Sequence, residues 1–293
     1  MTNQIEVAVL GAGSTMGLAM ARNIARSGVP VRAWNRTAEK AKPLEGHGPQ
    51  VFDDAREAAA GANVILTMLA DGDAVIGTVE RALEKASGDV LWLQMSTIGE
   101  AATRRCIELA EARGLTLIDA PVLGTKQPAE EGKLVVLASG PQDARERVQP
   151  IFDAVGQKTI WVGEAGAGTR LKMVANAWVL TVTEGTAETL ALAEGLGLDP
   201  QLFLDAIEGG ALDLPYLRIK AKAIMERNFE PSFRLTLAAK DARLIEEAAQ
   251  HHEIDVPLFA TIRRRLAEGA QEHGDEDFSA TYWTSAPRRT DRA

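Results

Sequence analysis

Short β-rich apolar runs alternate with helical patterns through the first half of the chain, and this alternation limits the folds that it can adopt. The apolar runs are residues 6–11, 30–35, 63–69, 90–96, 116–122, 134–140 and 158–163. Helical patterns lie between several of them, including residues 16–28, 37–44 and 100–114. Strand and helix in repeated succession predict a parallel sheet covered on both faces by helices. The first half is therefore predicted to be an α/β domain built on a doubly wound parallel sheet.

The second half is predicted to be all-helical. The strand pattern stops at about residue 165, and residues 168–195 read as one long helix that is followed by further helical patterns. We therefore predict two domains, 1–164 and 165–293, joined by the long helix. The last residues, about 284–293, lack apolar periodicity and are predicted to form a disordered tail.

The composition disfavours several classes of partner. The 293-residue chain has a formal net charge of −9, which argues against nucleic acid or an anionic membrane as the main partner. The single cysteine, Cys106, rules out an intrachain disulfide, fits a reducing compartment and lies in a helical pattern where packing explains it. No apolar run approaches the roughly 20 residues of a membrane span, and the first residues are too few and too polar for a secretory signal. We therefore expect a cytoplasmic protein that acts on a small molecule.

A glycine-rich turn follows the first predicted strand and opens the first predicted helix. In the segment VAVLGAGSTMGLAMA, Gly11 permits a tight turn and Gly13 lets the backbone approach a pyrophosphate. The N–H groups and the positive end of the following helix can hold that pyrophosphate. With its third glycine at Gly17, the turn is one residue longer than the standard fingerprint, and a turn that merely needs glycine is the alternative. The strand and helix around it favour a dinucleotide-binding Rossmann domain.

The end of the second predicted strand favours NADP over NAD. NAD-binding domains usually place an acid there to accept the ribose hydroxyls, whereas NADP-binding domains tend to offer an arginine. This chain has Asn35, Arg36 and Thr37, with no acid before Glu39. A guanidinium and a hydroxyl suit a 2′-phosphate, although Arg36 can also be a solvated surface residue. We predict NADPH as the cofactor.

Residues 170–178, RLKMVANAW, set Lys172 and Asn176 one helical turn apart in a largely apolar segment. Both side chains face solvent if the helix is simply amphipathic. If they face a substrate, the lysine can give a carbonyl oxygen the proton that it needs when NADPH supplies the hydride. Asn176 can then orient the substrate or hydrogen-bond the lysine. The position of Lys172 beside GAGTRL, at the junction of the predicted domains, favours the catalytic interpretation.

With GAGSTMG, WNRT, MST and GAGTRLKMVAN in this order, the chain resembles the β-hydroxyacid dehydrogenase family over roughly residues 5–283. The segments WNRTAEK, KQPAEEGKLVVLASG, LAAKDARL and DEDFSA look most like the NADP-dependent glyoxylate/succinic semialdehyde reductases of that family. The resemblance implies hydride transfer between NADPH and a small β-hydroxyacid or a semialdehyde of the glyoxylate, succinic or tartronate type. It also implies an active site in the cleft between a Rossmann and a helical domain, and assembly as a homodimer or homotetramer.

The resemblance further assigns individual residues. The catalytic lysine corresponds to Lys172 and its neighbouring asparagine to Asn176. The residues expected at the substrate are Ser96, Leu123, Gly124 and Thr125. The residues expected at the cofactor are Gly11, Ala12, Gly13, Ser14, Thr15, Met16, Asn35, Arg36, Thr37, Met68, Leu69, Thr97 and Lys240, with Asp241 beside the last.

Three departures from the family pattern bear on these assignments. The glycine turn is one residue longer, so individual phosphate contacts do not follow from it. The family's KxxNN is here KMVAN, so that Ala175 replaces the first asparagine. The family's PVSG is here PVLG, so that Leu123 stands where a serine would donate a hydrogen bond to a substrate carboxylate. Gly124 keeps the close approach of the backbone, and Thr125 can supply a hydroxyl.

Two other functions remain open. An imine reductase shares this architecture and the NRT segment, and Leu123 would suit its less polar substrate, but such enzymes usually lack the lysine that is Lys172 here. A non-catalytic relative, used as an oligomerisation or nucleotide-sensing module, would be expected to have lost Lys172. No metal site is predicted, because His251 and His252 have no third ligand at metal spacing.

Overall fold

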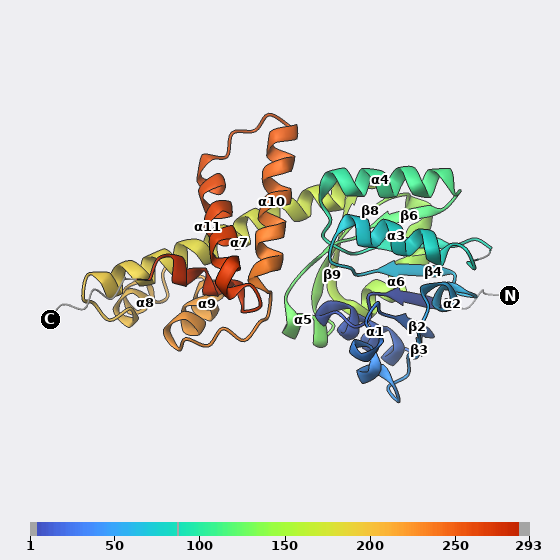
Figure 1. Cartoon of the computed structure of the whole chain (residues 1–293), viewed down its shortest axis with the longest axis horizontal. Helices are drawn as coiled ribbons and strands as arrows, with labels where there is room; N and C mark the ends of the chain where they lie inside the picture. Colours follow the sequence, from blue (N-terminus) through green and yellow to red (C-terminus); the bar gives the residue numbers. More distant parts are fainter. Residues whose placement is uncertain (1–4, 87, 287–293) are drawn as a thin grey trace. The chain divides into compact units, whose positions relative to one another are not determined.

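The computed structural model describes residues 5–86 and 88–286 and divides into two compact units, Met1–Met173 and Val174–Ala293. The first unit contains a sheet with helices on both faces, and the second consists of helices (Figure 1), which confirms the predicted fold class. Of the predicted tail, Thr284 ends a 3₁₀ helix, and residues 287–293 lie outside the described part of the chain.

The sheet of the first unit has the strand order of a dinucleotide-binding fold. Its parallel part runs in the order β3-β2-β1-β4-β5-β6. These strands are β1 (Val7–Leu10), β2 (Val31–Trp34), β3 (Gln50–Phe52), β4 (Val64–Thr67), β5 (Leu91–Gln94) and β6 (Thr116–Asp119). Every residue of β1, β4 and β5 is buried, as expected for strands covered on both faces. The order reverses between β1 and β4, and ligands bind beyond the carboxyl ends of the strands at such a point.

The far end of the sheet differs from the wholly parallel pattern that the sequence predicts. β8 (Leu134–Ser139) runs antiparallel to β6 and to the short strand β7 (Val122–Leu123), whereas β9 (Gly156–Gly163) is parallel to β8. The chain reverses here because β7 pairs back onto β8. The helix between them, α5 (Lys126–Glu130), has only five residues and makes no full crossover of the sheet.

Helices cover the two faces of this sheet with separate apolar cores. α1 (Thr15–Arg26) and α6 (Arg145–Val155) pack together on one face. α2 (Ala55–Ala59), α3 (Gly72–Ala82) and α4 (Gly99–Ala112) lie on the other (Figure 1). The sheet is thus fixed from both sides, which holds the loops at its carboxyl edge in place.

Residues 37–44 form two 3₁₀ turns, Ala38–Lys40 and Lys42–Leu44, instead of the α-helix that their pattern predicts. Pro43 explains the difference, because it has no N–H to donate to a carbonyl four residues earlier and its ring obstructs that carbonyl. The turns keep this segment close to the end of β2.

The second unit confirms the long helix that the sequence predicts. α7 (Ala167–Gly195) begins in the first unit and continues into the second, where shorter helices follow it. These are α8 (Gln201–Ile207), α9 (Pro215–Met225), α10 (Leu235–His251), α11 (Pro257–His273) and the 3₁₀ helix η4 (Phe278–Thr284). α10 packs on α11, and η4 contacts α9, α10 and α11. Proline opens α9 and α11, where its missing N–H costs no helical hydrogen bond.

A buried ion pair fastens α9 to η4 in this unit. Lys220 Nζ lies 2.7 Å from Asp277 Oδ1, and both residues are 3% exposed. The hydroxyls of Ser232 and Ser279 donate to the same carboxylate. Burial lowers the pKa of Lys220, and the nearby Asp277 carboxylate opposes this change. Such a pair is costly to break from one side, because the remaining charge is left buried.

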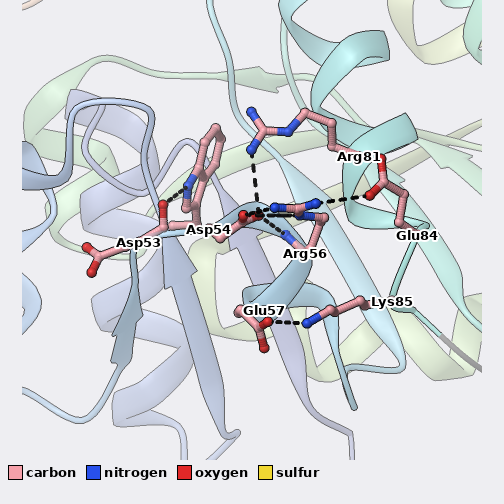
Figure 2. A network of polar contacts seen from close by, with 8 residues as sticks. Asp53, Asp54, Arg56, Glu57, Arg81, Glu84 and Lys85 are labelled. Atoms are coloured by element: carbon pink, nitrogen blue, oxygen red, sulfur yellow. Dashed lines mark hydrogen bonds and ion pairs between the residues drawn. The ribbon is translucent and has the colours of Figure 1, made fainter.

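A partly exposed network of ion pairs joins α2 to α3, where Arg81 contacts Asp54 at 3.6 Å, and to the residues after α3 (Figure 2). Asp54 caps α2 by accepting the N–H of Arg56 at 2.9 Å, and the Arg56 guanidinium contacts both Asp54 and Glu84. Arg56 lowers the pKa of Asp54 to about 2 through these hydrogen bonds. Because solvent screens exposed pairs, the network stabilises the fold only modestly.

Candidate active site

The glycine turn lies at the switch point of the sheet, between the ends of β1 and β4. Gly11 has a φ of +101°, and a Cβ there would lie 2.2 Å from the Met68 carbonyl oxygen. Ser14 caps α1 by accepting the Gly17 N–H at 3.0 Å, and a Cβ on Gly17 would lie 2.2 Å from the Gly11 carbonyl oxygen. The third glycine therefore allows close packing of the helix on the turn despite the extra residue.

The first turn of α1 can hold a pyrophosphate. Thr15 and Met16 open the helix, so their N–H groups have no carbonyl one turn earlier to bind. Ala12, in the turn itself, is fully buried, and its N–H donates to the Trp34 carbonyl oxygen at 2.9 Å. The free N–H groups at the start of a helix, together with the helix dipole, bind phosphate groups in proteins.

Asn35 ties the glycine turn to the end of β2. Its Oδ1 accepts the Gly13 N–H at 3.2 Å, and its Nδ2 donates to the Thr37 carbonyl oxygen at 2.8 Å. A Cβ on Gly13 would lie 2.6 Å from both Asn35 Cγ and Lys40 Cβ. Arg36, Thr37 and Lys40 are exposed. Asn35 therefore positions the turn, while three polar or cationic side chains beside it remain open to solvent.

Ser96 and Thr97 follow β5 and differ in what they offer to a ligand. Ser96 is fully buried, and its Oγ accepts the Leu69 N–H at 2.8 Å and lies 3.2 Å from the Thr67 carbonyl oxygen, to which it donates. The Ser96 hydroxyl thus hydrogen-bonds to the backbone at the end of β4. Met68, in the same segment, is also buried. Thr97 is half-buried and is the residue of the pair with surface left for a ligand.

Lys172 lies against the strand that follows β6. The side chain is buried, and its Nζ donates to the Val122 carbonyl oxygen at 2.7 Å. The next residues are the predicted substrate loop: Leu123 and Thr125 are half-buried, and Gly124 has a φ of +129°. The structure therefore brings Lys172 and the predicted substrate loop together within the first unit.

The first turn of α7 is seated on buried polar side chains, which we call the Asp119 cluster: Asp119 from β6, Thr103 from α4, Ser139 from β8 and Thr169 from α7 itself. Thr169 donates its N–H and its hydroxyl to the two oxygens of Asp119, both at 2.8 Å. The Gly168 N–H donates to Ser139 Oγ at 2.9 Å. Burial raises the pKa of Asp119 to about 6, although the hydrogen bonds from Thr169 oppose this shift.

Asn176 lies in the second unit with both residues of the predicted KD pair. Its Nδ2 donates to Asp241 Oδ2 at 2.7 Å, and Asp241 Oδ1 lies 2.9 Å from Lys240 Nζ. Asn176 and Asp241 are 4% and 3% exposed, so this link is shielded from water. Asp241 therefore connects two residues that the family resemblance assigned separately.

Sequence reasoning missed several of these residues. The Asp119 cluster joins positions far apart in the chain, and the only local signal was a carboxylate that ends an apolar strand in LIDAPV. Lys40 belongs to the NRTAEK segment, but its contact with Gly13 depends on the 3₁₀ turn that follows β2.

Other candidate sites find little support. Cys106 is fully buried, and burial raises the pKa of its thiol to about 12, which fits a packing residue. Within residues 5–86 and 88–286, no group of three or more His, Cys, Asp or Glu side chains could hold a metal ion. Over the same residues, none of the helices combines the length and apolar character needed to span a membrane.

Two family descriptions match consecutive parts of the chain. Residues 6–163 match the NAD binding domain of 6-phosphogluconate dehydrogenase. Residues 166–284 match the NAD-binding domain of NADP-dependent 3-hydroxyisobutyrate dehydrogenase. The first match ends with β9, and the second begins one residue before α7.

Curated relatives match over almost their full length. The chain is 30% identical to glyoxylate/succinic semialdehyde reductase 1 of Arabidopsis thaliana over 280 residues, which are 94% of this chain and 96% of the relative. It is 32% identical to a probable 3-hydroxyisobutyrate dehydrogenase of Mycobacterium tuberculosis over 290 residues, 96% of this chain and 98% of the relative.

Solved structures share the fold. A Mycobacterium tuberculosis 3-hydroxyisobutyrate dehydrogenase with L-serine has a TM-score of 0.87 at 30% identity, covering 96% of this chain and 99% of that one. An imine reductase of Myxococcus stipitatus with NADP+ has a TM-score of 0.63 at 20% identity, covering 94% and 98%, and shows the fold alone.

Proposed function

The chain belongs to the β-hydroxyacid dehydrogenase family, and from this premise we propose that it transfers hydride between NADPH and a small β-hydroxyacid or semialdehyde. Glyoxylate, succinic semialdehyde and tartronate semialdehyde are the candidate carbonyl substrates, and the first two occur in the name of a relative. Lys172 is the proposed general acid and base. The observation that carries the proposal is the buried Lys172 ammonium, which is held 2.7 Å from the Val122 carbonyl oxygen beside residues 123–125.

The proposed chemistry needs a proton at the substrate oxygen. A bound nicotinamide nucleotide supplies the hydride in reduction and takes it in oxidation. Lys172 donates a proton from Nζ to the carbonyl oxygen as negative charge develops there, and the amine takes it back in the reverse direction. Val122 orients the ammonium through its carbonyl oxygen, which limits the motion of a long and flexible side chain. Asn176, one helical turn further on, is proposed to orient the substrate.

The proposed preference for NADPH rests on the side chains that follow β2. Arg36, Thr37 and Lys40 are exposed, and Lys40 is held next to the glycine turn by its contact with Gly13. The first acid after β2 along the chain, Glu39, lies 2.8 Å from Lys42 Nζ, so its charge is balanced locally. A guanidinium, a hydroxyl and an ammonium complement a 2′-phosphate better than ribose hydroxyls.

The proposed substrate is a β-hydroxyacid or semialdehyde whose carboxylate is bound by a residue other than the family's serine. Leu123 has no donor where the family has serine, and Thr125 is the nearby half-buried hydroxyl that can replace it. The apolar Leu123 is also the one observation that favours reduction of an imine. Oxidation of NADPH with glyoxylate, the three semialdehydes (succinic, tartronate and methylmalonate) and cyclic imines, each at matched concentration, separates these possibilities.

The role of Lys172 is tested by replacing it. We expect Lys172→Ala to lower kcat at least 100-fold, since general acid catalysis typically contributes about 10²–10⁴-fold. NADPH binding, followed by the fluorescence of the reduced nicotinamide, should stay within twofold of the native value. Lys158→Ala, which removes an exposed lysine of β9, is the control. Near-native turnover by Lys172→Ala would contradict the proposed mechanism.

The role of Arg36 is tested by comparing two cofactors. We expect Arg36→Ala to raise the Kd of NADPH about 10-fold or more, because it removes one charge-assisted contact of roughly 1.5–3 kcal/mol. The Kd of NADH should change less than twofold. Arg26→Ala removes an exposed arginine at the other end of α1 and should affect neither cofactor. Equal losses for NADPH and NADH would mean that Arg36 does not bind the 2′-phosphate.

A homodimer or homotetramer in the cytoplasm is the proposed setting. Large apolar side chains of the second unit, Trp178, Leu196 and Leu212 among them, are 63–73% exposed in the single chain and suit burial against another copy. The lone, fully buried thiol of Cys106 fits a reducing compartment. Light scattering of the purified protein measures the assembly directly.

A further inference from the structure

The start of α7 is attached to the first unit at two points. At the first, the Thr169 N–H and hydroxyl each donate to Asp119 at 2.8 Å. At the second, Lys172 Nζ donates to the Val122 carbonyl oxygen at 2.7 Å. Three residue steps separate the two points along the helix, and three separate them along the strand and loop. The two segments therefore form a closed ring in which the position of Lys172 depends on how Thr169 is held.

Asp119 is suited to holding this ring because, within residues 5–86 and 88–286, the hydrogen-bond donors to its carboxylate are neutral. Besides Thr169, the Ser139 hydroxyl lies 3.2 Å from Asp119 Oδ2. The Thr169 N–H belongs to the first turn of a helix, where four N–H groups have no carbonyl partner of their own and the helix dipole favours a negative charge. Asp119 is 0% exposed, so water cannot replace it as an acceptor.

The first turn of α7 packs closely against the strands of the sheet. Gly168 packs so closely on the strands that a Cβ would lie 2.2 Å from the Leu137 carbonyl oxygen and 2.9 Å from that of Asp119. Ser139 holds the same turn by accepting the Gly168 N–H at 2.9 Å. A proton donor must come within about 2.6–3.2 Å of its acceptor, and a displacement of about 1 Å can cost roughly 100-fold in rate.

We propose that Asp119 is a positioning residue of this enzyme, whose buried carboxylate fixes the first turn of α7 and thereby places the Lys172 ammonium for proton transfer. The inference rests on the proposed function of Lys172. Asp119 acts through Thr169 and is not itself a group that contacts substrate or cofactor. Its loss should therefore lower kcat and leave cofactor binding nearly unchanged.

The test combines substitutions at both residues. Asp119→Asn keeps one acceptor oxygen and should lower kcat about 10-fold, whereas Asp119→Ala keeps none and should lower it about 100-fold. The KM of the aldehyde and the Kd of NADPH should each change less than twofold. In the Lys172→Ala background, assayed at high enzyme concentration, Asp119→Ala should lower the residual turnover less than twofold, because residues that act as a unit are not additive.

The control is a buried carboxylate of the second unit. Asp277→Asn removes the charge of a residue that is 3% exposed and bonded by hydroxyls, as Asp119 is, but lies in the second unit. It should reduce stability and leave kcat within twofold. Hydrogen exchange of the peptide 167–173 should accelerate in Asp119→Asn and remain native in Asp277→Asn.

The outcomes separate the two proposals. Native turnover by Lys172→Ala would overturn the proposed function and this inference with it. An inactive Lys172→Ala with native kcat and native exchange in Asp119→Asn would overturn the inference alone. Fully additive losses in the double variant would also overturn it, because Asp119 would then act independently of Lys172. If Asp119→Ala does not fold, the same test of additivity can be made with Asp119→Asn, alone and combined with Lys172→Ala.

Discussion

Adding one methyl group at Gly168 should separate the first turn of α7 from the sheet. The Cβ of Gly168→Ala would lie 2.2 Å from the Leu137 carbonyl oxygen and 3.1 Å from Ser139 Oγ. A carbon and a carbonyl oxygen normally approach no closer than about 3.3 Å. Since the nearest obstacle is the backbone of strand β8, the helix must move by about 1 Å.

The energetic cost follows from the hydrogen bonds that this movement breaks. The two bonds from Thr169 to Asp119, at 2.8 Å, and the bond from Gly168 to Ser139, at 2.9 Å, would lengthen to almost 4 Å. Hydrogen bonds to a charged group contribute about 1.5–3 kcal/mol each, and the neutral one about 1 kcal/mol. Alanine recovers up to about 1 kcal/mol as a better helix former than glycine. We expect the free energy of unfolding to fall by about 4 kcal/mol.

The measurement is urea or thermal unfolding of Gly168→Ala beside Gly185→Ala, a second glycine of the same helix. Gly185 is exposed, and a Cβ there would meet nothing within 4 Å, so alanine should stabilise this position by about 1 kcal/mol. For a unit of this size, about 4 kcal/mol corresponds to a decrease in Tm of about 10 °C. Gly168→Ala should also lose most of its kcat because Lys172 moves with the turn.

The packing predicts that the same glycine-to-alanine change lowers the free energy of unfolding at residue 168 and raises it at residue 185. A Gly168→Ala variant as stable as the native protein would show that α7 is not seated on the sheet as described. Equal destabilisation by Gly185→Ala would attribute the effect to the helix and not to the Asp119 cluster.

Three further predictions concern buried groups. Because the pKa of Asp119 is raised from 3.8 to about 6 in the fold, the native chain holds a proton between pH 4 and 6 that the unfolded chain has released. The free energy of unfolding of the native protein relative to Asp119→Asn should therefore fall as the pH rises through this window, by about 3 kcal/mol, and a constant difference would contradict this. Lys220→Met should cost about 3–5 kcal/mol by leaving Asp277 buried without its cation, and adding Asp277→Asn should recover part of this loss in urea unfolding. Cys106 should not react with a thiol reagent at pH 8 until the protein is denatured, and rapid native labelling would refute its burial.

Periodicity made the main elements predictable. The strands β1, β4 and β5 are buried along their whole length, so they are nearly continuous apolar runs. α7 is long enough for its helical pattern to be unambiguous. The glycine turn was equally visible, because Gly11 and Gly17 are required by local backbone geometry. Short elements escaped this reasoning, since the three residues of β3 and the five of α2 span too few positions to show a period.

The candidate site was predictable only where one segment of chain carries it. Lys172 and Asn176 stand together in RLKMVANAW, whereas their partners, the Val122 carbonyl and Asp241, lie 50 and 65 residues away. Ser96 illustrates the same limit, because its position after β5 suggested a substrate contact but gave no sign that its hydroxyl bonds to Thr67 and Leu69, nearly 30 residues earlier. Hydrogen bonds between distant residues depend on how strands pair, and a single sequence does not encode them locally.

The packing of the first turn of α7 on the sheet also determines where this enzyme can be recombined with a relative. A junction at residue 164 or 165 looks natural, because β9 ends at Gly163 and α7 begins at Ala167. Such a chimaera would carry the relative's first helical turn into the Asp119 cluster, where Gly168 and Thr169 fit one particular set of strands. Joining the two proteins after Met173 instead keeps that turn and Lys172 with their own sheet. The better place to exchange the helical unit is therefore inside α7.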